Sequence, residues 1–271
     1  MKRRQISLWL SLAVLTGGGA IACGMPPAST PPAAELTVTD EPVALTVSAA
    51  ASVQDALKDA QAAYQDVAPH VTITYNFGSS GSLAQQITQG APTDVFLSAS
   101  TKWMDEVEAQ DQIQPGSRQD LLQNDIVLVV PPGETAIKAF ADLATGAVDK
   151  VAIGEPDSVP AGRYAKETLT SLNLFEPLQP QLVFTKDVRQ VLAYVETGNV
   201  DAGLVYATDA QLSDQAQVVA TAAADTHAPI IYPIAVVQDT DQAAAAQAFI
   251  DFLASETGVA IFQGYGFAMA E

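Results

Sequence analysis

Short strand-like runs alternate with segments of helical periodicity along nearly the whole chain after residue 43, and this alternation is the strongest constraint on the fold. Residues 45–48 alternate apolar and polar side chains as a strand does, and apolar residues at 53–67 then recur at helical spacing. Further strands are predicted at 71–77, 94–97, 125–130, 151–153, 182–184, 202–206, 217–220 and 230–237. Helices are predicted between them at 83–89, 103–109, 160–172, 187–198, 242–253 and 259–263. Regular strand–helix alternation predicts an α/β fold with mostly parallel sheets and helices on both faces.

Composition excludes several classes of function. Hydrophobic residues make up 48% of the 271 residues and charged residues 16%, which is enough apolar material for a sizeable core. The 31 acidic residues outnumber the 12 basic ones and give a net charge of −19, so neither nucleic acid nor anionic lipid is an expected partner. The single cysteine, Cys23, excludes an internal disulfide and a cysteine-based zinc site. His70 and His227 are far apart in sequence, so no histidine metal cluster and no cofactor are expected.

The N-terminus has the pattern of a secretory signal. A basic start, M-K-R-R, precedes a short apolar run at 6–15, and the small residues of 20–22 lead into Cys23. This order resembles the bacterial lipoprotein processing site, which implies a signal at 1–22 and a lipid on Cys23 as the only membrane attachment. Ordinary signal cleavage beside an incidental cysteine is the alternative. The proline-rich stretch that follows predicts an extended tether over 23–43.

Recognisable catalytic motifs are missing from the sequence. There is no G-x-S-x-G, no G-x-x-x-x-G-K-[ST], no G-x-G-x-x-G and no H-E-x-x-H. The serine-rich loop at 78–82 resembles a nucleophile elbow, but a nucleophilic serine needs a base, and both histidines are expected to be solvated. A binding protein is therefore predicted rather than an enzyme, with a secreted hydrolase that uses Ser80 as the alternative from another class.

Five predicted strand ends lead into loops that offer hydrogen-bond donors. They contain Ser52, the Ser79–Ser80 pair, the P-A-G of 160–162, the D-V of 187–188, and Tyr206. In open α/β sheets ligands bind outside the carboxyl ends of strands, and helix N-termini there favour anions. The alternative is ordinary helix capping, and Ser52 with Asp55 has the spacing of a capping box. Arg163 and Arg189 adjoin these loops, where their charge could weaken the negative field around an anion, but they are expected to be solvated on helix faces.

At these loops the sequence resembles the periplasmic molybdate-binding proteins of ABC importers, the ModA family. The resemblance covers 44–271 and rests on eight ordered motifs: V-S-A-A-A-S (47–52), F-G-S-S-G-S-L-A (77–84), G-A-P-T-D-V-F-L-S-A (90–99), K-W-M-D (102–105), V-P-A-G-R-Y-A-K-E (159–167), D-V-R (187–189), G-L-V-Y-A-T-D-A (203–210) and Y-G-F (265–267). It implies a two-lobed, type II periplasmic-binding-protein fold with the ligand cleft between the lobes. Lobe I is expected at 44–124 with 232–271, and lobe II at 125–231.

The same resemblance implies the ligand and its site. Molybdate, and tungstate as well, would be held by the hydroxyls of Ser52, Ser80 and Tyr206 and by the backbone amides of Ala161 and Val188. All of these groups are donors, which suits a fully deprotonated dianion, whereas a phosphate site would also need an acceptor. The expected protein is an extracytoplasmic monomer that passes the ion to an ABC permease. A receptor for sulfate or another tetrahedral oxyanion is the alternative within the same class.

Overall fold

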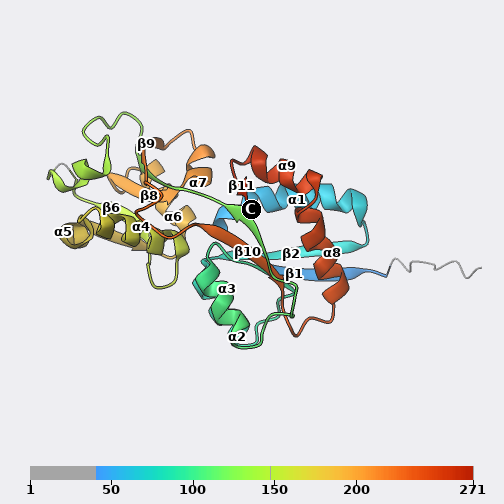
Figure 1. Ribbon diagram of the computed structural model, residues 1–271. Coiled ribbons are helices and arrows are strands. Elements are labelled where there is room, and N and C mark those ends of the chain that lie inside the picture. The colour runs from blue at the N-terminus through green and yellow to red at the C-terminus, as the bar shows by residue number, and fades with distance from the viewer. Residues whose placement is uncertain (1–40, 147, 271) are drawn as a thin grey trace, which may run out of the picture. The chain divides into compact units, whose positions relative to one another are not determined.

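Two mixed β-sheets with helices packed against them organise the described part of this computed structural model, which comprises residues 41–146 and 148–270 (Figure 1). These residues belong to one compact unit, Asp40–Glu271. The predicted signal, the lipid site at Cys23 and most of the predicted tether lie outside the described residues.

The first sheet has six strands in the order β11-β4-β10-β3-β1-β2. Its parallel half comprises β1 (Val43–Ala50), β2 (Val71–Gly78) and β3 (Val95–Leu97). Its antiparallel half comprises β10 (Ile231–Val236), β4 (Gln119–Gln123) and β11 (Ala268–Met269). We call this sheet and its helices lobe I.

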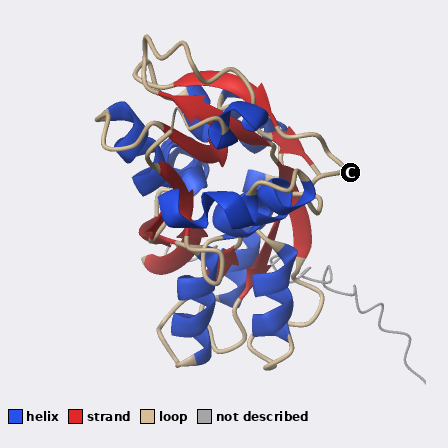
Figure 2. Ribbon diagram, turned by 90° about the vertical axis from the view of Figure 1, so that its left-hand side faces the viewer, coloured by secondary structure: helices blue, strands red, loops and turns tan. Residues whose placement is uncertain are grey.

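Alternate side chains of the central strands of lobe I face two different layers of helices. Val95 and Leu97 belong to the apolar cluster shared with α1 (Gln54–Val67), α8 (Ala243–Leu253) and α9 (Glu256–Gly264). Phe96 and Ala235 instead join a second cluster with α2 (Ser80–Thr88) and α3 (Thr101–Glu108). The period of two along a strand therefore places helices on both faces of the sheet, as Figures 1 and 2 show.

The second sheet, with its helices, forms lobe II and has the strand order β7-β6-β8-β5-β9. Its strands are β5 (Ile126–Val130), β6 (Val151–Gly154), β7 (Leu182–Thr185), β8 (Ala202–Tyr206) and β9 (Gln217–Thr221). Its helices are α4 (Pro160–Ser171), α5 (Phe175–Leu178), α6 (Val188–Glu196) and α7 (Ala207–Gln211). Every residue of β5, β6 and β8 is buried, which is why these strands are continuous apolar runs in the sequence. Short 3₁₀ turns complete the order: η1 (Ala51–Val53), η2 (Phe140–Ala144) and η3 (Gln179–Gln181).

The chain passes between the two sheets twice. It leaves lobe I after β4 and enters β5 within three residues, and it returns between β9 and β10. The loops that follow β1, β2, β6, β7 and β8 therefore come from both sheets, and these are the loops selected from the sequence.

The predicted α/β class is confirmed, but the prediction of mostly parallel sheets is wrong. Strands β5 and β10 begin where the chain crosses between sheets, and each pairs antiparallel with both of its neighbours. The short elements β4, α5, α7 and β11 were not predicted. Helix α2 begins at Ser80 rather than at 83, because Ser79 provides the cap.

Within 41–146 and 148–270, no single helix is long and apolar enough to cross a membrane. Helices α8 and α9 pass that test only when taken together, and they meet at an angle of 60°.

Candidate functional site

A small cavity is lined by residues from both lobes and includes all five residues predicted to bind the ligand. Lobe I contributes Ala50, Ala51, Ser52, Gly78, Ser79, Ser80 and Ala99. Lobe II contributes Val159, Pro160, Ala161, Asp187, Val188 and Tyr206. The centre of a water molecule can move within ≈ 10 Å³ of this space. A void of that size is about what one water molecule needs, so this cavity is too small for an organic solute.

Ser52 lies within η1, between the end of β1 and the start of α1. The capping box predicted for Ser52 and Asp55 is wrong, because the helix ends here carry no side-chain cap. The Ser52 hydroxyl is buried and lies 3.1 Å from Oη of Tyr232. The Ser52 hydroxyl is therefore not used in a hydrogen bond to the backbone of the helix that follows it.

Ser80 is the first residue of α2, and its neighbour Ser79 supplies the cap. Oγ of Ser79 accepts a hydrogen bond from the backbone N–H of Ser82 at 3.3 Å. Oγ of Ser80 accepts the backbone N–H of Ala99 at 2.9 Å and is fully buried. The two adjacent serines thus have different tasks, and the Ser80 hydroxyl keeps its own proton for another acceptor.

The two predicted backbone donors are at the N-termini of α4 and α6. Pro160 occupies the first turn of α4, and Ala161 follows it. A Cβ on Gly162 would lie 1.9 Å from the carbonyl oxygen of Gly154, so glycine is what allows this helix start to press against β6. Val188 is the first residue of α6, and the Asp187 side chain caps this helix by accepting the N–H of Gln190 at 2.9 Å. The first N–H groups of a helix have no partner within it, so both helix starts offer donors to the cavity.

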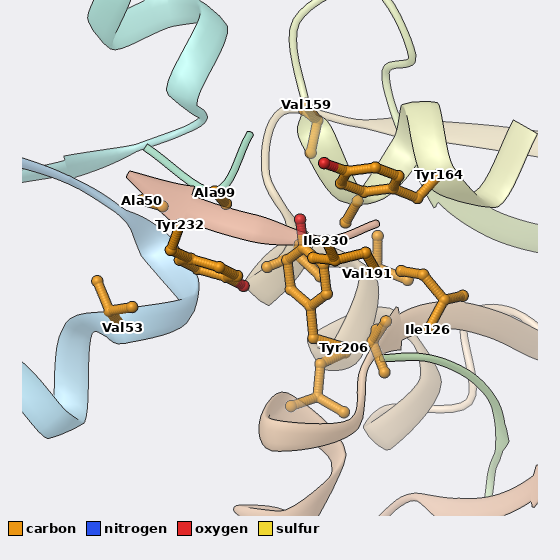
Figure 3. Close-up of a cluster of buried hydrophobic side chains, with 14 of the residues drawn as sticks. Ala50, Val53, Ala99, Ile126, Val159, Tyr164, Val191, Tyr206, Ile230 and Tyr232 are labelled. Carbon is orange, nitrogen blue, oxygen red and sulfur yellow. The ribbon is translucent and has the colours of Figure 1, made fainter. Parts of the chain in front are cut away.

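Tyr206 ends β8 and contributes a hydroxyl that is buried without a partner. Its side chain is 1% exposed, and its Oη makes no hydrogen bond to any group that the structure describes. Figure 3 shows its ring beside those of Tyr164 and Tyr232. Burial raises the pKa of Tyr206 well above its ordinary value, so the hydroxyl remains protonated and can act only as a neutral ligand.

Charge in the cavity lining is limited to Asp187, whose carboxylate is used in capping α6. Among the described residues, no group of three or more His, Cys, Asp or Glu could hold a metal cation. Each predicted ligand group is an N–H or O–H dipole. The chemistry of this site therefore suits a small anion rather than a cation.

Arg189 joins the two lobes beside the cavity, and the prediction that it is a solvated surface charge is wrong. From α6 its Nη2 donates to the carbonyl oxygen of Ser52 at 3.1 Å, and its Nη1 lies 2.9 Å from Oδ2 of Asp55. Its Nε lies 2.6 Å from Oδ1 of the fully buried Asp209. Burial raises the pKa of Asp209 to about 6, although the Arg189 guanidinium acts in the opposite direction.

Two further contacts hold the lobes together on the other side of the cavity. Nη2 of Arg163 donates to Oγ of Ser100 at 3.1 Å, so this arginine is also not simply solvated. The backbone N–H of Gly81 donates to the carbonyl oxygen of Ser158 at 3.0 Å. The structure is thus a closed form, in which both lobes contact each other around the cavity.

Neither histidine lies in the cavity lining, so nothing in this lining is arranged to activate Ser80 as a nucleophile. Nδ1 of His227 lies 2.8 Å from the carbonyl oxygen of Ala228. The arrangement gives no support to a serine hydrolase.

The sequence profile of the bacterial extracellular solute-binding proteins matches residues 45–268. The chain belongs to this family. This solute-binding protein is 46% identical over 232 residues to YvgL of Bacillus subtilis, which is named as a candidate ABC transporter substrate-binding lipoprotein; the match covers 85% of the chain and 88% of YvgL. It is 38% identical over 230 residues to the molybdate-binding protein ModA of Haemophilus influenzae, over 83% of the chain and 89% of ModA.

A solved structure agrees with the fold of this solute-binding protein. The periplasmic molybdate-binding protein of Azotobacter vinelandii superposes with a TM-score of 0.76 at 26% identity, over 84% of this chain and 100% of that one. The predicted periplasmic-binding-protein fold, and the resemblance on which that prediction rested, are therefore confirmed.

Sequence reasoning did not find Tyr232 and Asn124, which lie directly behind Ser52. Nδ2 of Asn124 donates to Oη of Tyr232 at 3.2 Å. Tyr232 is 180 residues from Ser52 in the chain, and no local pattern signals such a contact.

Proposed function

We propose that this solute-binding protein captures molybdate, and tungstate as well, outside the cytoplasm and delivers it to an ABC importer. The observation that carries the proposal is the Tyr206 hydroxyl, which is buried, unpartnered within the described structure and part of a residue that lines the small cavity between the lobes. A buried hydroxyl without a partner is unfavourable by about 1–3 kcal/mol, and a bound oxyanion would remove that penalty.

The donor set suits a fully deprotonated tetrahedral dianion. The hydroxyls of Ser52, Ser80 and Tyr206 and the amides of Ala161 and Val188 can each donate to a different lone pair of the four oxygens. Hydrogen bonds to a charged acceptor contribute about 1.5–3 kcal/mol each. After desolvation and ordering are subtracted, such a set is compatible with a dissociation constant of roughly micromolar to nanomolar.

Because the proposed ligands come from both lobes, the ion favours the closed form. Ser52 and Ser80 belong to the first expected lobe, at 44–124 with 232–271, while Ala161, Val188 and Tyr206 belong to the second, at 125–231. A ligand that contacts both halves shifts the population towards closure, and the closed form is what the permease would recognise. No cofactor and no catalytic step are needed.

The proposal includes the attachment of the protein. A signal at 1–22 would be removed, Cys23 would carry the lipid, and 23–43 would tether a monomeric body to the membrane surface. Mass spectrometry of the mature N-terminus tests this part: an unmodified Cys23, or cleavage at another bond, would reject the lipid anchor.

Titration calorimetry of the purified protein with molybdate, tungstate, sulfate and phosphate tests the ligand. We expect molybdate and tungstate to bind with micromolar or lower dissociation constants, and sulfate and phosphate to bind much more weakly. Sulfate binding as tight as that of molybdate would assign the site to another oxyanion. No heat with any of the four would refute an oxyanion site.

A further inference from the structure

Tyr232 lies behind the cavity, where it is hydrogen-bonded to Ser52 and its ring packs against Tyr206. It is fully buried in β10, and it is not among the residues that line the cavity. Its Oη has two hydrogen-bond partners in the described structure, Oγ of Ser52 at 3.1 Å and Nδ2 of Asn124 at 3.2 Å. Figure 3 shows the Tyr232 ring beside Tyr206, with the ring centroids 5.7 Å apart.

The orientation of the Asn124 amide is set by its neighbours. Asn124 lies where the chain crosses from β4 to β5, and its Oδ1 accepts the backbone N–H of Asp125 at 2.9 Å. Its Nδ2 therefore faces Oη of Tyr232 and Oγ1 of Thr208, the latter at 2.8 Å. An amide nitrogen can only donate, so Tyr232 must accept from Asn124.

This fixes the direction of the next hydrogen bond. If Ser52 donated to Tyr232, the buried phenolic proton would have no acceptor among the two hydrogen-bond partners of Oη, an arrangement that buried polar groups rarely adopt. The favoured arrangement has Tyr232 donating to Oγ of Ser52, which leaves the Ser52 proton directed to the cavity. We infer that Tyr232 and Asn124 are positioning residues that hold the Ser52 hydroxyl as a donor to the bound oxyanion, an inference that rests on the function proposed above.

The Ser80 hydroxyl is also oriented as a donor to the cavity, but by a main-chain group rather than by side chains. Its Oγ accepts a hydrogen bond from the backbone N–H of Ala99 at 2.9 Å, and a backbone N–H can only donate. Each serine oxygen therefore already accepts one hydrogen bond from the protein, and each hydroxyl proton is left to donate to the cavity. A main-chain N–H sets the orientation of the Ser80 hydroxyl, whereas side chains set that of Ser52. The orientation of the Ser52 hydroxyl can therefore be altered by substitution.

The consequence is discrimination between two kinds of dianion. Molybdate carries no proton and can accept from every group of the site. At about pH 8 inorganic phosphate is mainly a dianion that retains one proton, and that proton needs an acceptor. With Tyr232 in place Ser52 directs its proton rather than a lone pair at the ligand, so Tyr232 disfavours the binding of protonated oxyanions.

The test compares the dissociation constants of molybdate and phosphate by calorimetry at about pH 8 for the wild type and for Tyr232→Phe, which removes one oxygen atom. We expect Tyr232→Phe to weaken molybdate binding about tenfold and to lower the phosphate-to-molybdate ratio of dissociation constants about tenfold, because Ser52 becomes free to accept. A purely structural role would change stability and leave this ratio unaltered.

Two other variants keep the test decisive. Tyr164→Phe is the matched control, because Tyr164 is also buried but its hydroxyl donates to the carbonyl oxygen of Pro229 at 3.5 Å rather than to Ser52. Asn124→Asp replaces the donor with an acceptor of the same shape, so Tyr232 would turn its proton away from Ser52. Both ligands are dianions, and the added charge therefore cancels in the ratio, which we expect to fall as in Tyr232→Phe.

The outcomes separate the two proposals. Absence of molybdate binding to the wild type would overturn the proposed function. Wild-type binding of molybdate, with the same phosphate-to-molybdate ratio in Tyr232→Phe, Asn124→Asp and Tyr164→Phe, would overturn the positioning role alone. If Tyr232→Phe does not fold, as shown by thermal unfolding, Asn124→Asp alone gives the same decision.

Discussion

Replacing Tyr206 by phenylalanine should change stability and binding in opposite directions. Tyr206 is 1% exposed, and its hydroxyl makes no hydrogen bond to any group that the structure describes. An unsatisfied buried hydroxyl is unfavourable by about 1–3 kcal/mol, so Tyr206→Phe should raise the free energy of unfolding of the ligand-free protein by up to that amount. For a domain of this size each kcal/mol corresponds to about 2–4 °C in Tm.

The same substitution should weaken molybdate binding. One donor to a dianion contributes about 1.5–3 kcal/mol, so its loss should raise Kd about 10- to 150-fold. Calorimetry measures this change, and differential scanning calorimetry without ligand measures the shift in Tm.

Tyr164→Phe provides the contrast, because it removes a hydroxyl that already has a partner in Pro229. It should lower Tm slightly and leave molybdate affinity unchanged. The reasoning about Tyr206 is refuted if Tyr206→Phe lowers Tm as Tyr164→Phe does, or if it binds molybdate as tightly as the wild type.

Three further substitutions test the lobe contacts, the buried charge and the helix start. Arg189→Lys keeps the charge but loses the fork that reaches Ser52, Asp55 and Asp209, so molybdate Kd measured by calorimetry should rise about tenfold. Burial raises the pKa of Asp209 from 3.8 to about 6, so its favourable contribution to folding is complete below about pH 4 and is lost as pH rises through about 6. Urea unfolding should therefore show the wild type losing roughly 3 kcal/mol relative to Asp209→Asn between about pH 4 and pH 7. Gly162→Ala should lower the free energy of unfolding by about 2 kcal/mol or more, because its Cβ would lie 1.9 Å from the Gly154 carbonyl oxygen.

Matched variants accompany these experiments. Arg118 is as exposed as Arg189 and also pairs with two carboxylates, but Asp105 and Glu108 are both in α3, so Arg118→Lys should leave binding unchanged. Equal effects of the two lysine substitutions would count against a lobe-bridging role. A Cβ at Gly264 would have no neighbouring atom within 4 Å, so Gly264→Ala should be tolerated. Similar losses in the free energy of unfolding at Gly162 and Gly264 would contradict the steric argument. A stability difference between wild type and Asp209→Asn that does not vary with pH would exclude Asp209 as the titrating group.

Much of the fold could be predicted because buried positions of strands and helices appear in the sequence as apolar residues at regular spacing. The buried run of β5 and the apolar spacing of α1 are examples, and both were located to within about two residues. The antiparallel position of β10 could not be predicted, since it depends on the chain returning from lobe II to a sheet begun almost 190 residues earlier. Strand β11 is only two residues long and has no periodicity to detect.

The residues predicted for the site were selected by two local signals, strand ends and helix starts, and by resemblance to known motifs. The structure brings all five to one cavity, although the task assigned to Ser52 as a possible cap was wrong. The sequence could not predict the residues that contact these five from outside the cavity. Tyr232 lies 180 positions from Ser52, and Arg189 lies 137 positions from the carbonyl it contacts, so only the folded chain relates them.

The bond from the Gly81 amide to the Ser158 carbonyl has a consequence for how this protein can vary. Both partners are main-chain atoms, so substitutions at neighbouring positions leave the donor and the acceptor in place, but position 81 itself requires glycine, because a Cβ there would clash with the Ser158 carbonyl oxygen and the Trp103 ring. Side chains at the neighbouring positions of the two loops can therefore differ between relatives, while the geometry that lets the two halves meet is inherited with the backbone itself.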